Sequence, residues 1–71
     1  MNLNPFEIEL LEGLKGKDNI TASDVNYPQE LFDITAISLR RKGLVSVVPT
    51  EEVKVACIQL TSFGRMWIAK P

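Results

Sequence analysis

The stretch that decides the fold is Leu39-Arg40-Arg41-Lys42-Gly43-Leu44-Val45. It is typical of a helix that ends in a basic last turn, stops at a glycine and continues directly into a strand. Further along the chain, Leu60-Thr61-Ser62-Phe63-Gly64-Arg65 is typical of a strand that leads into a helix capped by threonine. Together the two stretches predict the order helix, β-hairpin, helix.

The helix that leads into Gly43 is predicted over about residues 28–42. Glu30 in its first turn and the basic triplet in its last turn both match the helix dipole. At helical spacing its core face collects Leu31, Phe32, Thr35, Ala36 and Leu39. Ile34, Ile37 and Arg41 point the other way. The helix is therefore amphipathic, with two aliphatic residues outside its core face.

Two earlier helices are predicted from their caps. Asn4-Pro5-Phe6-Glu7 supplies an N-cap, a proline at the first helical position and a glutamate that completes a capping box. At helical spacing this helix presents a core stripe of Phe6, Leu10, Leu11 and Leu14. Thr21 and Asp24 form a second capping pair. Pro28 keeps that second helix short, because it disfavours helical geometry at Tyr27.

The β-hairpin is predicted from two apolar segments, residues 44–48 and 53–60, joined by Pro49-Thr50-Glu51-Glu52. The second strand alternates Ala56, Ile58 and Leu60 with Val53, Val55 and Cys57, so both faces of the hairpin are predicted to be apolar. A free-standing hairpin would have one polar face. A homodimer, or the chain's own termini, would cover the second apolar face.

The composition argues against catalysis. The 71 residues include no histidine, and Cys57 is the only cysteine, so the usual pairs of nucleophile and base cannot form. We assign the carboxylates to solvated helix surface and a turn: Glu7, Glu9, Glu12, Glu51 and Glu52. We expect no enzymatic activity, no cofactor and no metal site.

One domain spanning residues 1–71 is expected, with no internal disulfide. A lone cysteine fits a reducing compartment. The chain opens without the pattern of a signal peptide, and it has no apolar run near the ~18 residues of a membrane span. These features predict a soluble cytoplasmic protein that does not bind membranes. Its net charge of −1 is lower than that of most nucleic-acid-binding domains.

The element order and both quoted stretches resemble the winged helix-turn-helix superfamily. In particular, the chain is similar to repressors related to the multiple-antibiotic-resistance regulator. In that family a Leu-x-x-Lys-Gly-Leu-Val segment ends the recognition helix, and a Leu-Thr-x-x-Gly-Arg segment follows the wing. The resemblance covers about residues 6–68. It implies an α+β winged-helix fold with three helices, a two-stranded hairpin wing and a C-terminal helix.

The resemblance also implies binding of double-stranded DNA by a small transcriptional regulator, with the third helix in the major groove. By position, the DNA-binding residues would be Gln29, Ser38, Arg40, Arg41, Lys42 and Lys54. Gln29 would read adenine, and Arg41 would contact a guanine or a phosphate. Carboxylates at Glu30 and Asp33 face the same groove and oppose binding to a polyanion.

A second hypothesis is a protein interaction module without DNA binding. It rests on the acidic and apolar face formed by Glu30, Asp33, Ile34 and Ile37, because exposed aliphatic clusters mark partner sites. The predicted interface residues are Ile34, Ile37, Val53 and Val55.

Two alternatives stay open at this point. The basic triplet 40–42 either compensates the helix dipole or contacts phosphates, and a rotated helix would bring Ile34 and Ile37 into the core.

Overall fold

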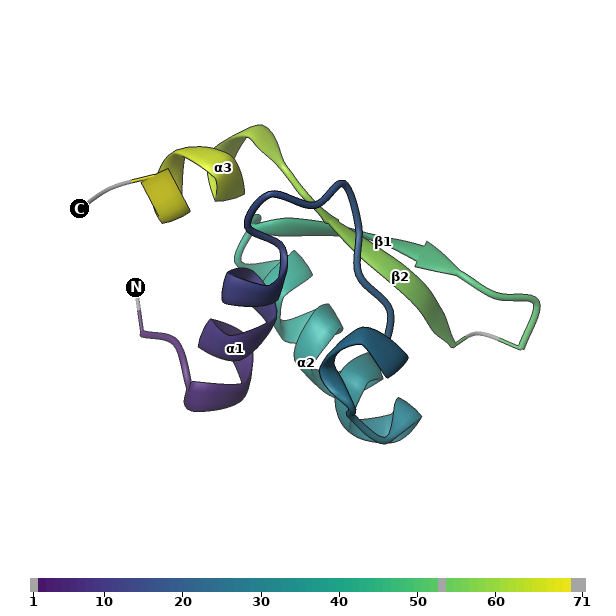
Figure 1. Cartoon of the computed structure of the whole chain (residues 1–71). Helices are drawn as coiled ribbons and strands as arrows, with labels where there is room; N and C mark the ends of the chain where they lie inside the picture. The colour runs from purple at the N-terminus through teal and green to yellow at the C-terminus, as the bar shows by residue number, and fades with distance from the viewer. Residues whose placement is uncertain (1, 53, 70–71) are drawn as a thin grey trace.

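The computed structural model describes residues 2–52 and 54–69. Its elements are α1 (Pro5–Gly13), the 3-10 turn η1 (Ser23–Val25), α2 (Gln29–Arg41), β1 (Val45–Pro49), β2 (Val55–Leu60) and α3 (Ser62–Ala69). The predicted order of helix, hairpin and helix is confirmed. Figure 1 shows α1 and α2 together on one side of the hairpin, with α3 beyond the end of β2. Over the described residues this is an α+β fold of three α-helices and one antiparallel pair of strands, compatible with a winged-helix layout.

The start of α1 follows its predicted capping box. Asn4 Oδ1 accepts a hydrogen bond from Glu7 N at 2.8 Å, and Glu7 Oε1 accepts one from Asn4 N at 2.9 Å. The core stripe is confirmed for Leu10, Leu11 and Leu14, which are buried. The prediction for Phe6 was wrong, because its side chain is 48% exposed. Phe6 instead packs edge-on against Tyr27, with ring centroids 5.9 Å apart.

The second capping pair forms as predicted, but it starts only a single 3-10 turn. Asp24 Oδ2 accepts from Thr21 N at 2.8 Å, and Thr21 Oγ1 accepts from Asp24 N at 3.3 Å. The backbone hydrogen bond from Thr21 holds the pKa of Asp24 below its ordinary value. The turn ends where Asn26 adopts a left-handed conformation with φ 58°. Pro28 follows two residues later, so there is no room for a longer helix.

A short bridge to β2 was not predicted. Ile20 and Ile58 exchange two backbone hydrogen bonds, at 3.1 and 3.0 Å. Both side chains are fully buried. The segment before η1 is therefore fixed to β2 of the hairpin. The side chains of Ile20 and Ile58 both contribute to the core.

The hairpin has an irregular register that moves one side chain to the other face. Val45 pairs with Leu60 and Val48 with Cys57, but Pro49 pairs with Val55, which leaves Ala56 without a partner in the ladder. Such a bulge shifts the alternation of faces. Val55 is only 5% exposed and belongs to the core together with Ile58, so its predicted place on an outer, interface-forming face was wrong. Val53, the neighbouring interface prediction, lies outside the described residues.

The outer face of the hairpin is more polar than predicted. The paired residues Ser46 and Gln59 are exposed, whereas Val48 and Cys57 form the apolar pair nearer the tip. Val45 on the inner face is only 2% exposed. The prediction of two apolar faces therefore holds only near the tip of the hairpin.

The two quoted sequence stretches meet in one joint. Gly43 adopts φ +79°, and its carbonyl oxygen accepts a hydrogen bond from Thr61 Oγ1 at 2.6 Å. Thr61 Oγ1 in turn accepts from Gly64 N at 2.9 Å, so the same hydroxyl caps α3. Thr61 N also donates to Leu44 O at 3.1 Å. This joint fixes α3 at the point where α2 passes into β1.

Helix α3 carries both packed and exposed apolar side chains. Trp67 and Ile68 are half-buried and pack against the core. Phe63 and Met66 are exposed, at 47% and 65%. Helix α3 therefore packs on the core through Trp67 and Ile68 and leaves Phe63 and Met66 exposed.

Candidate functional site

The exposed face of α2 is the main surface that the sequence singled out. Its inner face is confirmed for Phe32, Thr35, Ala36 and Leu39, which are buried. Leu31, predicted on the same face, is only half-buried. Ile34 is 64% exposed and therefore lies outside the core, while Ile37 is half-buried. Glu30, Arg40 and Arg41 are exposed. This face thus has an aliphatic centre, an acidic first turn and a basic last turn.

The predicted base reader Gln29 is hydrogen-bonded within the protein. Gln29 Nε2 donates to Val55 O at 2.8 Å and to Asp33 Oδ1 at 2.7 Å. The same Asp33 oxygen accepts from Val55 N at 3.0 Å. We call these three residues the hairpin clamp, because they fasten the start of β2 to the first turns of α2. The structure therefore turns the Asp33 carboxylate and the Gln29 amide toward β2.

Two other predicted DNA-binding residues, Ser38 and Lys42, face α1. Lys42 Nζ donates to Glu7 Oε2 at 2.7 Å and to Glu7 Oε1 at 2.8 Å, and it also reaches Asn2 O at 3.1 Å. Ser38 Oγ donates to Glu7 Oε2 at 2.9 Å. Both side chains thus help to join α1 to the end of α2.

Glu7 is the residue that the sequence prediction misplaced most clearly. The prediction of a solvated surface position was wrong, because Glu7 is 1% exposed. Burial alone would raise the pKa of its carboxyl group, but the hydrogen bonds from Lys42, Asn4 N and Ser38, together with the charge of Lys42, hold this pKa below its ordinary value. A signal was present in the sequence, because Glu7 continues the spacing of Leu10, Leu11 and Leu14 by one turn.

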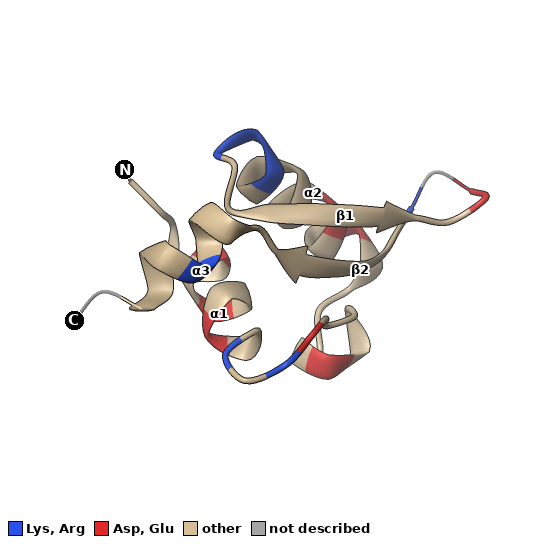
Figure 2. Ribbon diagram, turned by 90° about the horizontal axis from the view of Figure 1, so that it is seen from above, with Lys and Arg blue, Asp and Glu red and all other residues tan. Residues whose placement is uncertain are grey.

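The tip of the hairpin carries both signs of charge. Lys54 Nζ lies 3.3 Å from Glu52 Oε2, and both side chains are largely exposed. An exposed pair of this kind contributes little to stability. Figure 2 shows the acidic tip, and it shows a basic segment where α2 ends. Among the described residues neither Arg40 nor Arg41 takes part in an ion pair.

Other site types find little support in the described parts of the chain. Residues 2–52 and 54–69 contain no group of three or more histidine, cysteine, aspartate or glutamate side chains able to hold a metal ion. Their helices are all too short or too polar to cross a membrane. Comparisons with protein-family models, with curated proteins and with solved structures found no match to this chain.

Proposed function

We propose that this protein is a winged-helix protein that binds double-stranded DNA and acts as a transcriptional regulator. The observation that carries the proposal is the exposed face of α2, from Glu30 to Arg41, beside a hairpin that the hairpin clamp fastens to it. A helix free along one face fits the major groove, and an adjoining hairpin reaches the neighbouring backbone. The bridge between Ile20 and Ile58 supports this layout by tying the segment before η1 to the hairpin.

Fewer residues are proposed to contact DNA than the family resemblance implied. Arg40 and Arg41 are exposed and would bind phosphates or a guanine edge. Ile34, at 64% exposure, would contact the methyl group of thymine. Gln29, Ser38 and Lys42 act as positioning residues, since their polar groups already bond within the protein.

Replacing both Arg40 and Arg41 by glutamine should weaken DNA binding at least about tenfold at low salt, because two cations that face a polyanion are removed. The measurement is fluorescence anisotropy of labelled mixed-sequence duplexes. The double change Lys15→Gln and Arg65→Gln is the matched control, since it also removes two exposed cations and both lie outside α2. Equal weakening in both variants would mean that only net charge matters. Absence of salt-dependent binding by the unaltered protein at micromolar concentration would remove the DNA proposal.

One chain offers only two arginines, Arg40 and Arg41, for phosphate contacts. We therefore propose that the protein binds DNA as a homodimer, and that it does so in the cytoplasm. Two phosphate contacts for each chain predict that log K falls with log salt at a slope of about −2 for a monomer and about −4 for a dimer. Salt titration measures the slope, and sedimentation or light scattering measures the mass of the particle. Together they distinguish a monomer from a dimer. A slope near −2 from a particle of monomer mass would contradict the dimer.

A protein interaction module is the second candidate, favoured by one observation. The most exposed residue of the α2 centre is the aliphatic Ile34, and Glu30 shares its face. An apolar centre with an acidic companion suits a protein partner better than a phosphate backbone. Under this candidate DNA would not bind, and α2 would dock by Ile34 and Ile37.

The substitution Ile34→Lys distinguishes the two candidates. If α2 lies against DNA, the added cation should strengthen binding to mixed duplexes by a few fold while reducing any preference for thymine-rich sites. Anisotropy on two duplexes that differ only in thymine content measures both effects. If α2 is a protein-docking face, neither the unaltered protein nor the variant will bind DNA.

A further inference from the structure

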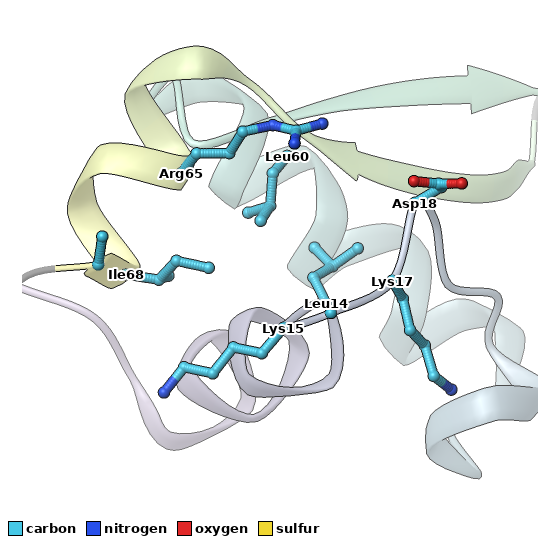
Figure 3. Close-up of a pocket in the computed structure, with 9 residues that line it drawn as sticks. Leu14, Lys15, Lys17, Asp18, Leu60, Arg65 and Ile68 are labelled. Carbon is cyan, nitrogen blue, oxygen red and sulfur yellow. The ribbon is translucent and has the colours of Figure 1, made fainter.

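Among the described residues, the backbone of β2 bonds to two other parts of the chain besides β1. At Ile58, both backbone groups bond to Ile20, at 3.0 and 3.1 Å. Figure 3 shows the segment that leads to Ile20, with Asp18 labelled, running beside β2. At Val55, three residues before Ile58, both backbone groups bond to the hairpin clamp on α2. The two attachments come from different elements, so together they fix how the hairpin lies against α2.

In the hairpin clamp, two side chains take the place of a neighbouring strand. Gln29 Nε2 donates to Val55 O at 2.8 Å, and Asp33 Oδ1 accepts from Val55 N at 3.0 Å. A residue of a paired strand would present the same donor and acceptor. Gln29 Nε2 also donates to the same Asp33 oxygen at 2.7 Å, which joins the two side chains. Both backbone groups of Val55, a residue only 5% exposed, are thereby satisfied.

Asp33 therefore has two opposite effects on a helix that binds DNA. Its negative charge opposes a polyanion. Its Oδ1 atom, however, accepts from both other members of the hairpin clamp, so it also holds the start of β2 to α2. Glu30, three residues earlier, carries the same charge but is exposed and takes no part in the clamp. Of these two carboxylates on α2, only Asp33 is connected to the hairpin.

We propose that Asp33 is a positioning residue for DNA binding, which acts through Val55 by fixing the hairpin against α2. This inference rests on the proposed function, because it concerns how α2 and the hairpin meet one duplex. With the hairpin clamp intact, the two elements are presented together, and binding does not have to order the hairpin. Without it, the hairpin is still attached at Ile58 but turns about that bridge, so ordering it weakens binding.

Two substitutions separate the charge of Asp33 from its hydrogen bonds. Asp33→Asn removes the charge but keeps an oxygen that can accept from Val55 N and from Gln29. Asp33→Ala removes both, and alanine is the better helix former, so α2 itself is not weakened. The two variants have the same net charge. We expect Asp33→Asn to bind DNA a few fold more tightly than the unaltered protein, and Asp33→Ala to bind at least about fivefold more weakly than Asp33→Asn. Fluorescence anisotropy on mixed-sequence duplexes at low salt measures both.

Glu30→Gln and Glu30→Ala form the matched control pair, and they should bind DNA with equal affinity, because Glu30 lies outside the hairpin clamp. Amide hydrogen exchange of the ¹⁵N-labelled protein tests the clamp without DNA. The amide of Val55 should exchange at least about tenfold faster in Asp33→Ala than in Asp33→Asn, because its acceptor is lost. The amide of Ile58, bonded to Ile20, is the internal reference and should exchange equally in both.

The inference is overturned if the unaltered protein binds DNA but the two folded Asp33 variants bind it equally, or if the Val55 amide exchanges equally in both. Neither result touches the proposed function. Absence of DNA binding by the unaltered protein overturns the proposed function together with this role of Asp33. If Asp33→Ala does not fold, Gln29→Met takes its place, since it removes the donor to Val55 O without changing the net charge. It should bind DNA at least about threefold more weakly than the unaltered protein, and equal affinity would overturn the inference.

Discussion

Replacing Gly64 by alanine should lower the free energy of unfolding by about 3 kcal/mol or prevent folding altogether. A β-carbon at Gly64 would overlap the carbonyl oxygen of Leu44 and lie 3.0 Å from its carbonyl carbon. Backbone atoms cannot swing aside as a flexible side chain can. Leu44 O is further held by the hydrogen bond from Thr61 N. The added methyl group would therefore push α3 away from the joint. Urea unfolding followed by the fluorescence of Trp67, the single tryptophan, measures the loss of stability.

Gly13→Ala is the matched control, since Gly13 is also a helical glycine. A β-carbon there would lie 3.4 Å from Val25 Cγ1 and 3.5 Å from Ile20 Cδ1, which are ordinary packing distances. Gly13 is the last residue of α1 and has no left-handed backbone conformation. Because alanine restricts the unfolded chain more than glycine does, this variant should be more stable by about 0.5 kcal/mol. The two substitutions should therefore have opposite signs. A Gly64→Ala variant as stable as the unaltered protein would show that α3 does not pack at this joint.

Lys42→Met should be the second severe substitution, with a loss of about 3 kcal/mol at neutral pH. The change leaves the carboxylate of Glu7 buried without its cation, and only Ser38 and the backbone of Asn4 still donate to it. Adding Glu7→Met to Lys42→Met should restore much of the stability, because the uncompensated charge is then gone. Urea unfolding of the single and double variants measures both effects. A double variant no more stable than Lys42→Met would contradict this account.

The pH dependence of stability follows from the lowered pKa of Glu7. Its pKa in the folded protein lies below the ordinary value of 4.5, so its stabilisation is fully present above that pH and is lost as the pH falls through the folded pKa. In Lys42→Met, burial without the cation favours the protonated acid. That variant should therefore lose less stability than the unaltered protein between pH 7 and 4. Glu12→Gln, a change at an exposed position of α1, should keep the pH profile of the unaltered protein.

Features that depend on neighbouring residues were predictable from the amino-acid sequence alone. The capping boxes at Asn4 and Thr21, the glycine stop at Gly43 and the threonine cap of α3 all formed as predicted. Each involves groups only a few residues apart, so the local chain geometry is enough to bring them together. The inner face of α2 was also predictable, because helical periodicity fixes which side chains share a face.

The partners of the polar residues in the candidate site, by contrast, are set by tertiary packing. Lys42 reaches Glu7 across 35 positions of the chain, and Gln29 reaches Val55 across 26. Periodicity places such residues on a face but does not say which element will pack there. The hairpin bulge likewise moved Val55 into the core. These outcomes depend on the packing of α1, α2 and the hairpin, because a long-range partner exists only once the core has brought distant segments together.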